Sequence, residues 1–323
     1  IDLADPDCAS FTPQLTVIKH VINDSGGTAA ASEFTMNVTG TNVSSGSFAG
    51  SEDGTTVTLD PGAYSVSENE YAGYTASSSE NCSGSIAIGE QKTCTITNDD
   101  IAPTVTINKT ITNDNGGTAI ETDFTYLFDG VVELFHSIAT PVTAGSHTVS
   151  ENPFFGYTPS QWSGDCNPDD GSIFLTPGQD ATCNITNDDQ AATLTVYKIV
   201  VNEEGGALQA VPGDFEITVT GTNVSPTPFP GSADGTVVNL DAGSYSVSET
   251  GPEGYSATSM SDACSSVDAG NIAVGESREC YIYNTSFEVT KARIIVDKVT
   301  DPENADQLFS FNLTGDGFDQ IFG

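Results

Sequence analysis

Basic residues are scarce in this chain of 323 residues. Eight Lys and Arg stand against 45 Asp and Glu, which gives a formal charge of −37 at pH 7. Because binding to phosphates requires a basic surface, this charge argues against a nucleic-acid partner. Long apolar runs are missing too. No stretch of about 18 apolar residues occurs, so the sequence predicts no membrane span.

Catalytic and metal-binding motifs are also missing. The histidines His20, His136 and His147 are scattered, and no HExxH, GxSxG or P-loop occurs. Segments such as NDSGG, TNDD and NPDDGS are rich in oxygen ligands but lack the spacing of an EF-hand, so we interpret them as tight turns. The sequence therefore predicts neither an enzyme that turns over outside substrates nor a cofactor or metal site.

Seven cysteines form three evenly distributed pairs with one left over. The pairs are Cys82 with Cys94, Cys166 with Cys183, and Cys264 with Cys280. This arrangement favours three disulfides in an oxidising compartment. Reduced buried thiols are the alternative, whereas metal binding would need CxxC or clustered histidines. The remaining Cys8 pairs with another chain, pairs with residues outside this sequence, or stays free.

Asn-x-Ser/Thr sequons occur nine times and would be usable in an exported protein. Eight are candidate glycosylation sites, namely Asn23, Asn37, Asn42, Asn81, Asn108, Asn184, Asn223 and Asn312. The ninth, Asn284, also belongs to the polar set described below, where a glycan would compete with a cross-link.

The chain is an internal repeat. LTVIKHVINDSGGTA at residue 15 is echoed by VTINKTITNDNGGTA at 105 and LTVYKIVVNEEGGAL at 194, and a fourth copy starts IIVDK at 294. Half of the basic residues occupy one repeat position, at Lys19, Lys109, Lys198 and Lys298. Such self-similarity indicates a tandem array of one structural unit.

Each complete repeat reads as a small all-β sandwich, because short alternating segments are separated by Gly, Asn, Asp and Pro and no helical period is sustained. We expect sandwiches at 15–100, 104–189 and 193–286, with a partial fourth at 291–323. The fourth would be completed by a continuing chain or by another subunit. Residues 1–14 fit no repeat. They would dock on a neighbouring subunit by strand addition, or form a leader or the tail of an earlier domain.

Each complete repeat also directs three polar residues to its apolar face. Under the two-residue period of a strand, Lys19 shares a face with Leu15 and Val17. A glutamate follows the YSVS or HTVS segment in the same way, and an asparagine follows the cysteine of the last strand. The inward sets are Lys19, Glu68 and Asn98; Lys109, Glu151 and Asn187; and Lys198, Glu249 and Asn284.

Two arrangements would make these buried groups tolerable. The first is an acyl transfer, in which a buried neutral lysine amine attacks the asparagine carboxamide, with the glutamic acid stabilising the intermediate and shuttling protons to the departing ammonia. The second is a buried Lys–Glu ion pair with asparagine as a hydrogen-bond partner. Recurrence in three domains favours the acyl transfer.

The set resembles the collagen-adhesin B-type (Cna-B, prealbumin-like or SpaA-like) domains of microbial surface proteins and pilins. The matching segments are YSVSENEYAGY, HTVSENPFFGY and YSVSETGPEGY, with His147 in place of tyrosine in the second. The resemblance implies prealbumin-like, Ig-like sandwiches and autocatalytic isopeptide bonds, with Glu68, Glu151 and Glu249 as the acids. The implied bonds are Lys19–Asn98, Lys109–Asn187 and Lys198–Asn284. The cysteine pairs depart from the family pattern.

Two functions follow as hypotheses. The first is a structural subunit of an extracellular filament, pilus-like appendage or surface stalk, whose partners are copies of itself. The second is a cell-surface adhesin that binds a host or glycan ligand. For the adhesin, the best candidate surface is NPFFGYTPSQW, with Phe154, Phe155, Tyr157 and Trp162.

Overall fold

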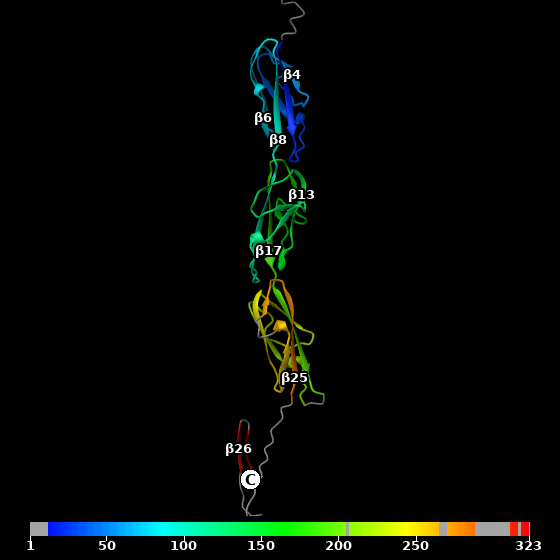
Figure 1. Cartoon of the computed structure of the whole chain (residues 1–323), viewed down its shortest axis with the longest axis vertical. Coiled ribbons are helices and arrows are strands. Elements are labelled where there is room, and N and C mark those ends of the chain that lie inside the picture. The colour runs from blue at the N-terminus through cyan, green and yellow to red at the C-terminus, as the bar shows by residue number, and fades with distance from the viewer. Residues whose placement is uncertain (1–11, 205–206, 265–269, 288–310, 316–317, 323) are drawn as a thin grey trace, which may run out of the picture.

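The computed structural model describes residues 12–204, 207–264, 270–287, 311–315 and 318–322. Within these residues the chain forms three β-sandwiches that follow one another end to end, as Figure 1 shows, and a separate hairpin. The predicted all-β fold is confirmed. No helix in the described part of the chain is long and apolar enough to span a membrane.

The first sandwich pairs a sheet of order β4-β1-β8-β6 with a sheet of order β3-β2-β5-β7. Its strands are β1 (Gln14–Ile22), β2 (Thr35–Thr39), β3 (Ser47–Ala49), β4 (Thr55–Thr58), β5 (Gly62–Glu68), β6 (Tyr74–Ser78), β7 (Ser83–Ile86) and β8 (Gln91–Asp100). Single turns of 3-10 helix, η2 (Ala31–Glu33) and η3 (Glu80–Cys82), precede β2 and β7.

The second sandwich repeats this topology, with sheets β12-β9-β17-β14 and β11-β10-β13-β16 and with β15 added beside β17. Its elements are β9 (Thr104–Thr112), η4 (Glu121–Asp123), β10 (Tyr126–Phe128), β11 (Val132–Leu134), β12 (Thr140–Pro141), β13 (Gly145–Glu151), β14 (Tyr157–Pro159), β15 (Ser163–Gly164), β16 (Ser172–Leu175) and β17 (Asp180–Asp189).

The third sandwich has sheets β21-β18-β25-β23 and β20-β19-β22-β24. Its elements are β18 (Ala192–Val201), η5 (Pro212–Asp214), β19 (Glu216–Thr220), β20 (Phe229–Pro230), β21 (Thr236–Leu240), β22 (Gly243–Thr250), β23 (Tyr255–Met260), η6 (Asp262–Cys264), β24 (Gly270–Ile272) and β25 (Ser277–Ser286). The hairpin of β26 (Phe311–Gly315) and β27 (Phe318–Phe322) lies in the partial repeat.

The first and last strands of every sandwich are parallel neighbours. β1 runs beside β8 with Val21 opposite Asn98. β9 and β17 pair in the same way, as do β18 and β25, with Ile111 opposite Asn187 and Val200 opposite Asn284. The chain therefore enters and leaves each domain along two hydrogen-bonded strands that point in one direction.

Each sandwich has a hydrophobic core of its own, formed by the inward residues of both sheets. In β1 the residues Leu15, Val17 and Lys19 are buried and alternate with more exposed ones, as the two-residue period predicts. The strand-addition hypothesis for residues 1–14 and most of the partial repeat at 291–323 fall outside the described residues. They stay predictions, as do the domain boundaries.

Candidate cross-linking sites

The lysine of each sandwich lies in the core on the inward face of the first strand. Its side chain is fully buried in all three domains. Each ammonium nitrogen lies over an aromatic ring, at 4.4 Å from the centre of Phe34, 4.1 Å from Phe124 and 4.4 Å from Phe215. The ring attracts the cation and covers it from water on that side.

The glutamate comes from the end of the strand in the opposite sheet. In the second domain, Lys109 Nζ donates to Glu151 Oε1 at 2.6 Å. In the first, Lys19 Nζ lies 3.5 Å from Glu68 Oε2, and in the third the corresponding distance, from Lys198 Nζ to Glu249 Oε2, is 3.6 Å. The three carboxylates are nearly buried, at 6 to 10% exposure.

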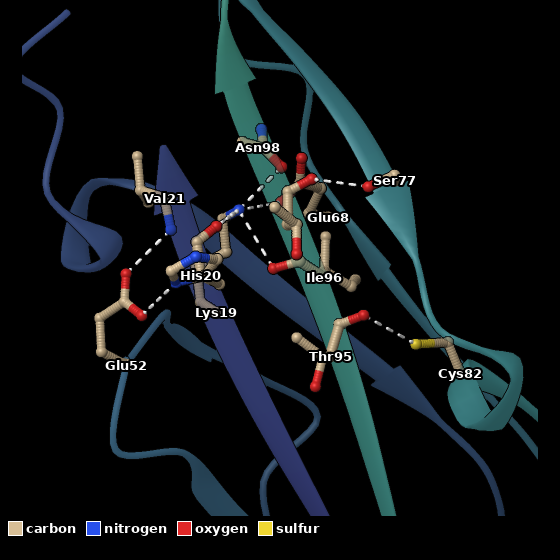
Figure 2. Close-up of polar contacts among 11 residues, drawn as sticks. Lys19, His20, Val21, Glu52, Glu68, Ser77, Cys82, Thr95, Ile96 and Asn98 are labelled. Atoms are coloured by element: carbon tan, nitrogen blue, oxygen red, sulfur yellow. Dashed lines mark hydrogen bonds and ion pairs between the residues drawn. The ribbon is translucent and has the colours of Figure 1, made fainter. Parts of the chain in front are cut away.

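The asparagine comes from the last strand, beside the lysine strand. Figure 2 shows the first site, where Lys19 Nζ donates to Asn98 Oδ1 at 2.7 Å and to the backbone oxygen of His20 at 3.1 Å. Asn187 and Asn284 are equally buried, and among the described residues their carboxamide oxygens have no hydrogen-bond partner. The structure thus brings Lys19, Glu68 and Asn98 into contact, and it pairs each lysine of the other two domains with its glutamate and places the asparagine buried on the neighbouring strand.

Burial lowers the pKa of Lys19, Lys109 and Lys198 below the ordinary value of 10.5, because the ammonium ion loses its hydration. The neighbouring Glu68, Glu151 and Glu249 act in the opposite direction without cancelling the effect. A lysine with a lowered pKa is more often the neutral amine, which is the nucleophilic form.

This arrangement can hold an ion pair, and it can also support attack on the carboxamide. Two surface pockets connect the first and third sites to solvent. One, of about 570 Å³, reaches Glu68 and Asn98, and another, of about 420 Å³, reaches Glu249 and Asn284. A small leaving molecule would therefore have a way out of the first and third sites.

A disulfide lies close to each asparagine. The cysteine four residues before it in the last strand is bonded to a cysteine of the segment that leads into β7, β16 or β24, with Cα atoms 4.6 to 5.2 Å apart. These bonds are Cys82–Cys94, Cys166–Cys183 and Cys264–Cys280. Cys8 lies outside the described residues, so its state stays a prediction.

Sequence reasoning missed two groups of residues around these sites. The phenylalanines Phe34, Phe124 and Phe215 recur at one repeat position, directly after the single 3-10 turns η2, η4 and η5. The tyrosine of the GY segment also has a role, since Tyr74 donates to Asn23 Oδ1 and accepts from the backbone N–H of Ala29. Recurrence was the available signal for both, but it did not indicate which groups they contact.

The sequons differ in their accessibility. Asn42, Asn81, Asn108 and Asn223 are exposed, whereas Asn37 and Asn184 are half-buried. Asn23 is held by Tyr74 and by its own bond to Ala29 O. Asn284 is buried in the third site, so a glycan does not fit there in the folded domain. Nothing is described of the side chain of Asn312, and glycosylation stays a prediction.

The aromatic segment of the second domain is mostly packed. Tyr157 and Trp162 are buried, and Phe154 packs against Phe124 and Tyr157. Phe155 is 71% exposed. Phe154 keeps 36% exposure, so the segment offers one largely exposed ring and one partly exposed ring.

Acidic side chains gather at two of the predicted turns, in the groups Asp24, Asp99 and Asp100 and Asp114, Asp188 and Asp189. The innermost carboxylates are already engaged. Asp100 accepts hydrogen bonds from the backbone N–H groups of Ser25 and Gly27, and Asp189 accepts from the backbone N–H groups of the equivalent loop in the second domain. These bonds explain the groups as turn contacts, and the expectation of no metal site stays a prediction.

Comparisons with known proteins give one family and several structures. A family model for a prealbumin-like fold domain matches residues 11–98, 99–185 and 189–282. No curated protein sequence matches the chain.

Three solved structures illustrate the likeness. The Bacillus anthracis TIE protein is 15% identical with a TM-score of 0.46, and the match covers 85% of this chain and 51% of that one. Two B repeat units of the Staphylococcus aureus collagen binding protein are 16% identical with a TM-score of 0.26, over 85% and 75%. The major pilin of Streptococcus pyogenes is 14% identical with a TM-score of 0.25, over 55% and 98%. The present chain spans about half the length of the TIE protein.

Proposed function

This chain belongs to the family of prealbumin-like fold domains, and we propose that it is a structural subunit of an extracellular filament, pilus-like appendage or surface stalk whose domains staple themselves with Lys–Asn isopeptide bonds. Its partners are copies of itself. The three disulfides support a location outside the cell, where thiols oxidise.

One observation carries this proposal. Every complete sandwich has a buried lysine on its first strand, a buried asparagine on its last strand and a nearly buried glutamate from the opposite sheet beside the lysine. Buried ion pairs add little net stability, and a core of this size would tolerate apolar residues at the same places. A threefold recurrence of the full set supports a reaction that needs all three groups.

The reaction starts with proton transfer from the lysine ammonium to the glutamate, over a contact such as the 2.6 Å bond between Lys109 and Glu151. The neutral amine then attacks the asparagine carboxamide carbon, whose oxygen accepts a hydrogen bond from the protonated carboxyl. The unpartnered oxygens of Asn187 and Asn284 are free to accept this bond. Collapse of the intermediate breaks the bond from carbon to the amide nitrogen.

The glutamate carries protons through the reaction. It takes a proton from the attacking nitrogen and gives one to the departing nitrogen, which leaves as ammonia. One C–N bond forms, one breaks, and no redox change occurs. The product is a secondary amide, so a buried charge pair is replaced by a neutral group. The ring of Phe34, Phe124 or Phe215 excludes water that would otherwise solvate the ammonium.

The position of the bond explains its use in a filament. Tension on the chain enters the first domain at Gln14 and leaves at Asp100, along the parallel strands β1 and β8. A bond from Lys19 to Asn98 would join these strands directly, so the force would bypass residues 20–97. The domain would then transmit tension without unfolding.

Peptide mapping by tandem mass spectrometry tests the proposal. After digestion of the reduced protein, we expect branched peptides that join Lys19 to Asn98, Lys109 to Asn187 and Lys198 to Asn284. A matched variant, Lys19→Arg, should lose the first branched peptide and keep the other two. Linear peptides at all three sites would contradict the proposal and leave the ion pair as the explanation.

A further inference from the structure

The two junctions between sandwiches are built alike. At the first, the N–H of Ala144 donates to the backbone oxygen of Ser25 at 2.7 Å. At the second, Ala242 donates to Asn115 at 2.8 Å. Ser25 and Asn115 occupy one repeat position, as do Ala144 and Ala242, so the same loop of each domain contacts the same turn of the next.

A single linker residue bridges each junction. The N–H of Ile101 donates to Gly73 in the domain before it, and its oxygen accepts from Gly178 in the domain after it, at 2.9 and 2.7 Å. Gln190 makes the equivalent bonds to Gly156 and from Gly275, both at 2.8 Å. Each linker is therefore hydrogen-bonded to both neighbours and does not behave as a free tether.

Glycines allow the domains to approach this closely. A Cβ atom at Gly26 would lie 2.5 Å from the oxygen of Ala144, and one at Gly73 would lie 2.5 Å from that of Pro177. Both residues also have φ near +80 to +90°. Gly116 and Gly156 repeat these contacts at the second junction. Neither the space nor the backbone there suits another residue.

In the described residues, the outer faces of the first and third sandwiches differ from the faces that form the joints. Pro61 takes the place of Ala144 in the first domain and has no N–H to donate. At the far end, the third domain has a loop two residues longer, and its own Leu208 covers Gly254, the counterpart of Gly73 and Gly156. The backbone oxygen of Gly254 still accepts a hydrogen bond from the N–H of Phe287, but the side chain of Leu208 fills the space beside Gly254.

We propose that the three sandwiches form one rigid rod, held by two equivalent joints in which the surface of each domain recognises the next domain. Each joint combines the alanine N–H, the linker bridge and two glycines. Without such contacts, domains that share a small interface move relative to one another. The rod does not depend on the isopeptide bonds, which lie inside the domains.

Distances between spin labels in the full-length chain test the rod. The exposed, equivalent positions Ser65, Thr148 and Ser246 take the labels, one pair at a time, in a Cys8→Ser background. We expect a narrow distance distribution for both neighbouring pairs. Broad distributions for both neighbouring pairs would overturn the proposed rod.

Proline substitutions test the joint itself. Ala144→Pro removes the donor at the first junction, in a turn that already tolerates proline at position 61. The distribution between Ser65 and Thr148 should broaden about twofold or more, towards that of unlinked domains. The pair Thr148 with Ser246 should stay narrow, which shows that the second domain remains folded. Ile101→Pro should act in the same direction, and Pro61→Ala should change neither pair. Unchanged widths in both Ala144→Pro and Ile101→Pro would overturn the proposed joint.

Discussion

At the scale of single residues, the buried lysine is the feature to be explained. The two-residue period was sufficient to predict that Lys19, Glu68 and Asn98 point to the core, because each shares a face with apolar neighbours. It was insufficient to predict Phe34 under the amine, since that contact joins residues of different strands and depends on the packing of the two sheets. The structure shows this contact and the equivalent contacts in the second and third domains.

The acid should be essential for the cross-link of its own domain. Glu151→Ala removes the carboxyl that takes and returns protons, so the second domain should keep its ammonia while the first and third still lose theirs. Intact mass resolves this difference. Glu133→Ala, which changes an exposed glutamate of the same domain, is the matched control and should lose all three ammonia molecules. Normal loss from Glu151→Ala would show that the carboxyl is not required.

An uncross-linked first domain should become more stable at alkaline pH. In Asn98→Ala the amine stays free, and burial holds the pKa of Lys19 below the 10.5 of the unfolded chain. Between these two values the unfolded state binds more protons, so stability rises with pH through the folded pKa and levels off near 10.5.

The measurement is urea unfolding of Asn98→Ala against the double variant Lys19→Met with Asn98→Ala. The difference in unfolding free energy between the two should shrink as pH rises towards about 10.5, because the penalty for burying the ammonium disappears. A difference that is constant with pH would contradict a desolvated lysine.

At the scale of elements, the pairing of the first and last strands determines what a cross-link can do. Repeats and alternation predicted the strands, and the positions of Lys19 and Asn98 suggested that their strands are neighbours. The parallel direction of β1 and β8 was not predictable, because local sequence does not encode which way a partner strand runs. Short edge strands such as β12 and β20 were not predictable either, because two residues cannot show an alternating pattern.

The disulfide should add stability that is independent of the cross-link. Replacing both Cys82 and Cys94 with Ala opens a loop of 12 residues. The expected loss is about 3 kcal/mol in the unfolding free energy of the first domain. Denaturant unfolding measures it, and the mass should still report three lost ammonias. Loss of the first cross-link together with the disulfide would show that Cys82–Cys94 positions Asn98 for reaction.

Pulling on single molecules should separate cross-linked from open domains. In the wild-type chain, stretching between the ends of the three-domain segment should give no unfolding step, because tension passes from β1 to β8 through the amide. Asn98→Ala should release one step, from the first domain alone. An exposed control, Asn81→Ala, should behave like wild type. Unfolding steps in the wild-type protein would contradict the proposed bypass.

At the scale of the whole molecule, each sandwich has a separate core, so the three proposed reactions should be independent of one another. The junctions contain backbone contacts and leave each triad within its own sandwich, so failure at one site should not affect another. The excess of acidic residues keeps the surface of the array strongly negative, which favours solubility and opposes random association of copies. Specific contacts are therefore required for assembly.

The mass of the intact, reduced and deglycosylated protein tests the central claim most directly. We expect a deficit of three ammonia molecules relative to the mass calculated from the sequence, one for each complete sandwich. A mass equal to the calculated value would contradict self-stapling. The lysines would then be ion-paired, and the disulfides would be the covalent staples of the described domains.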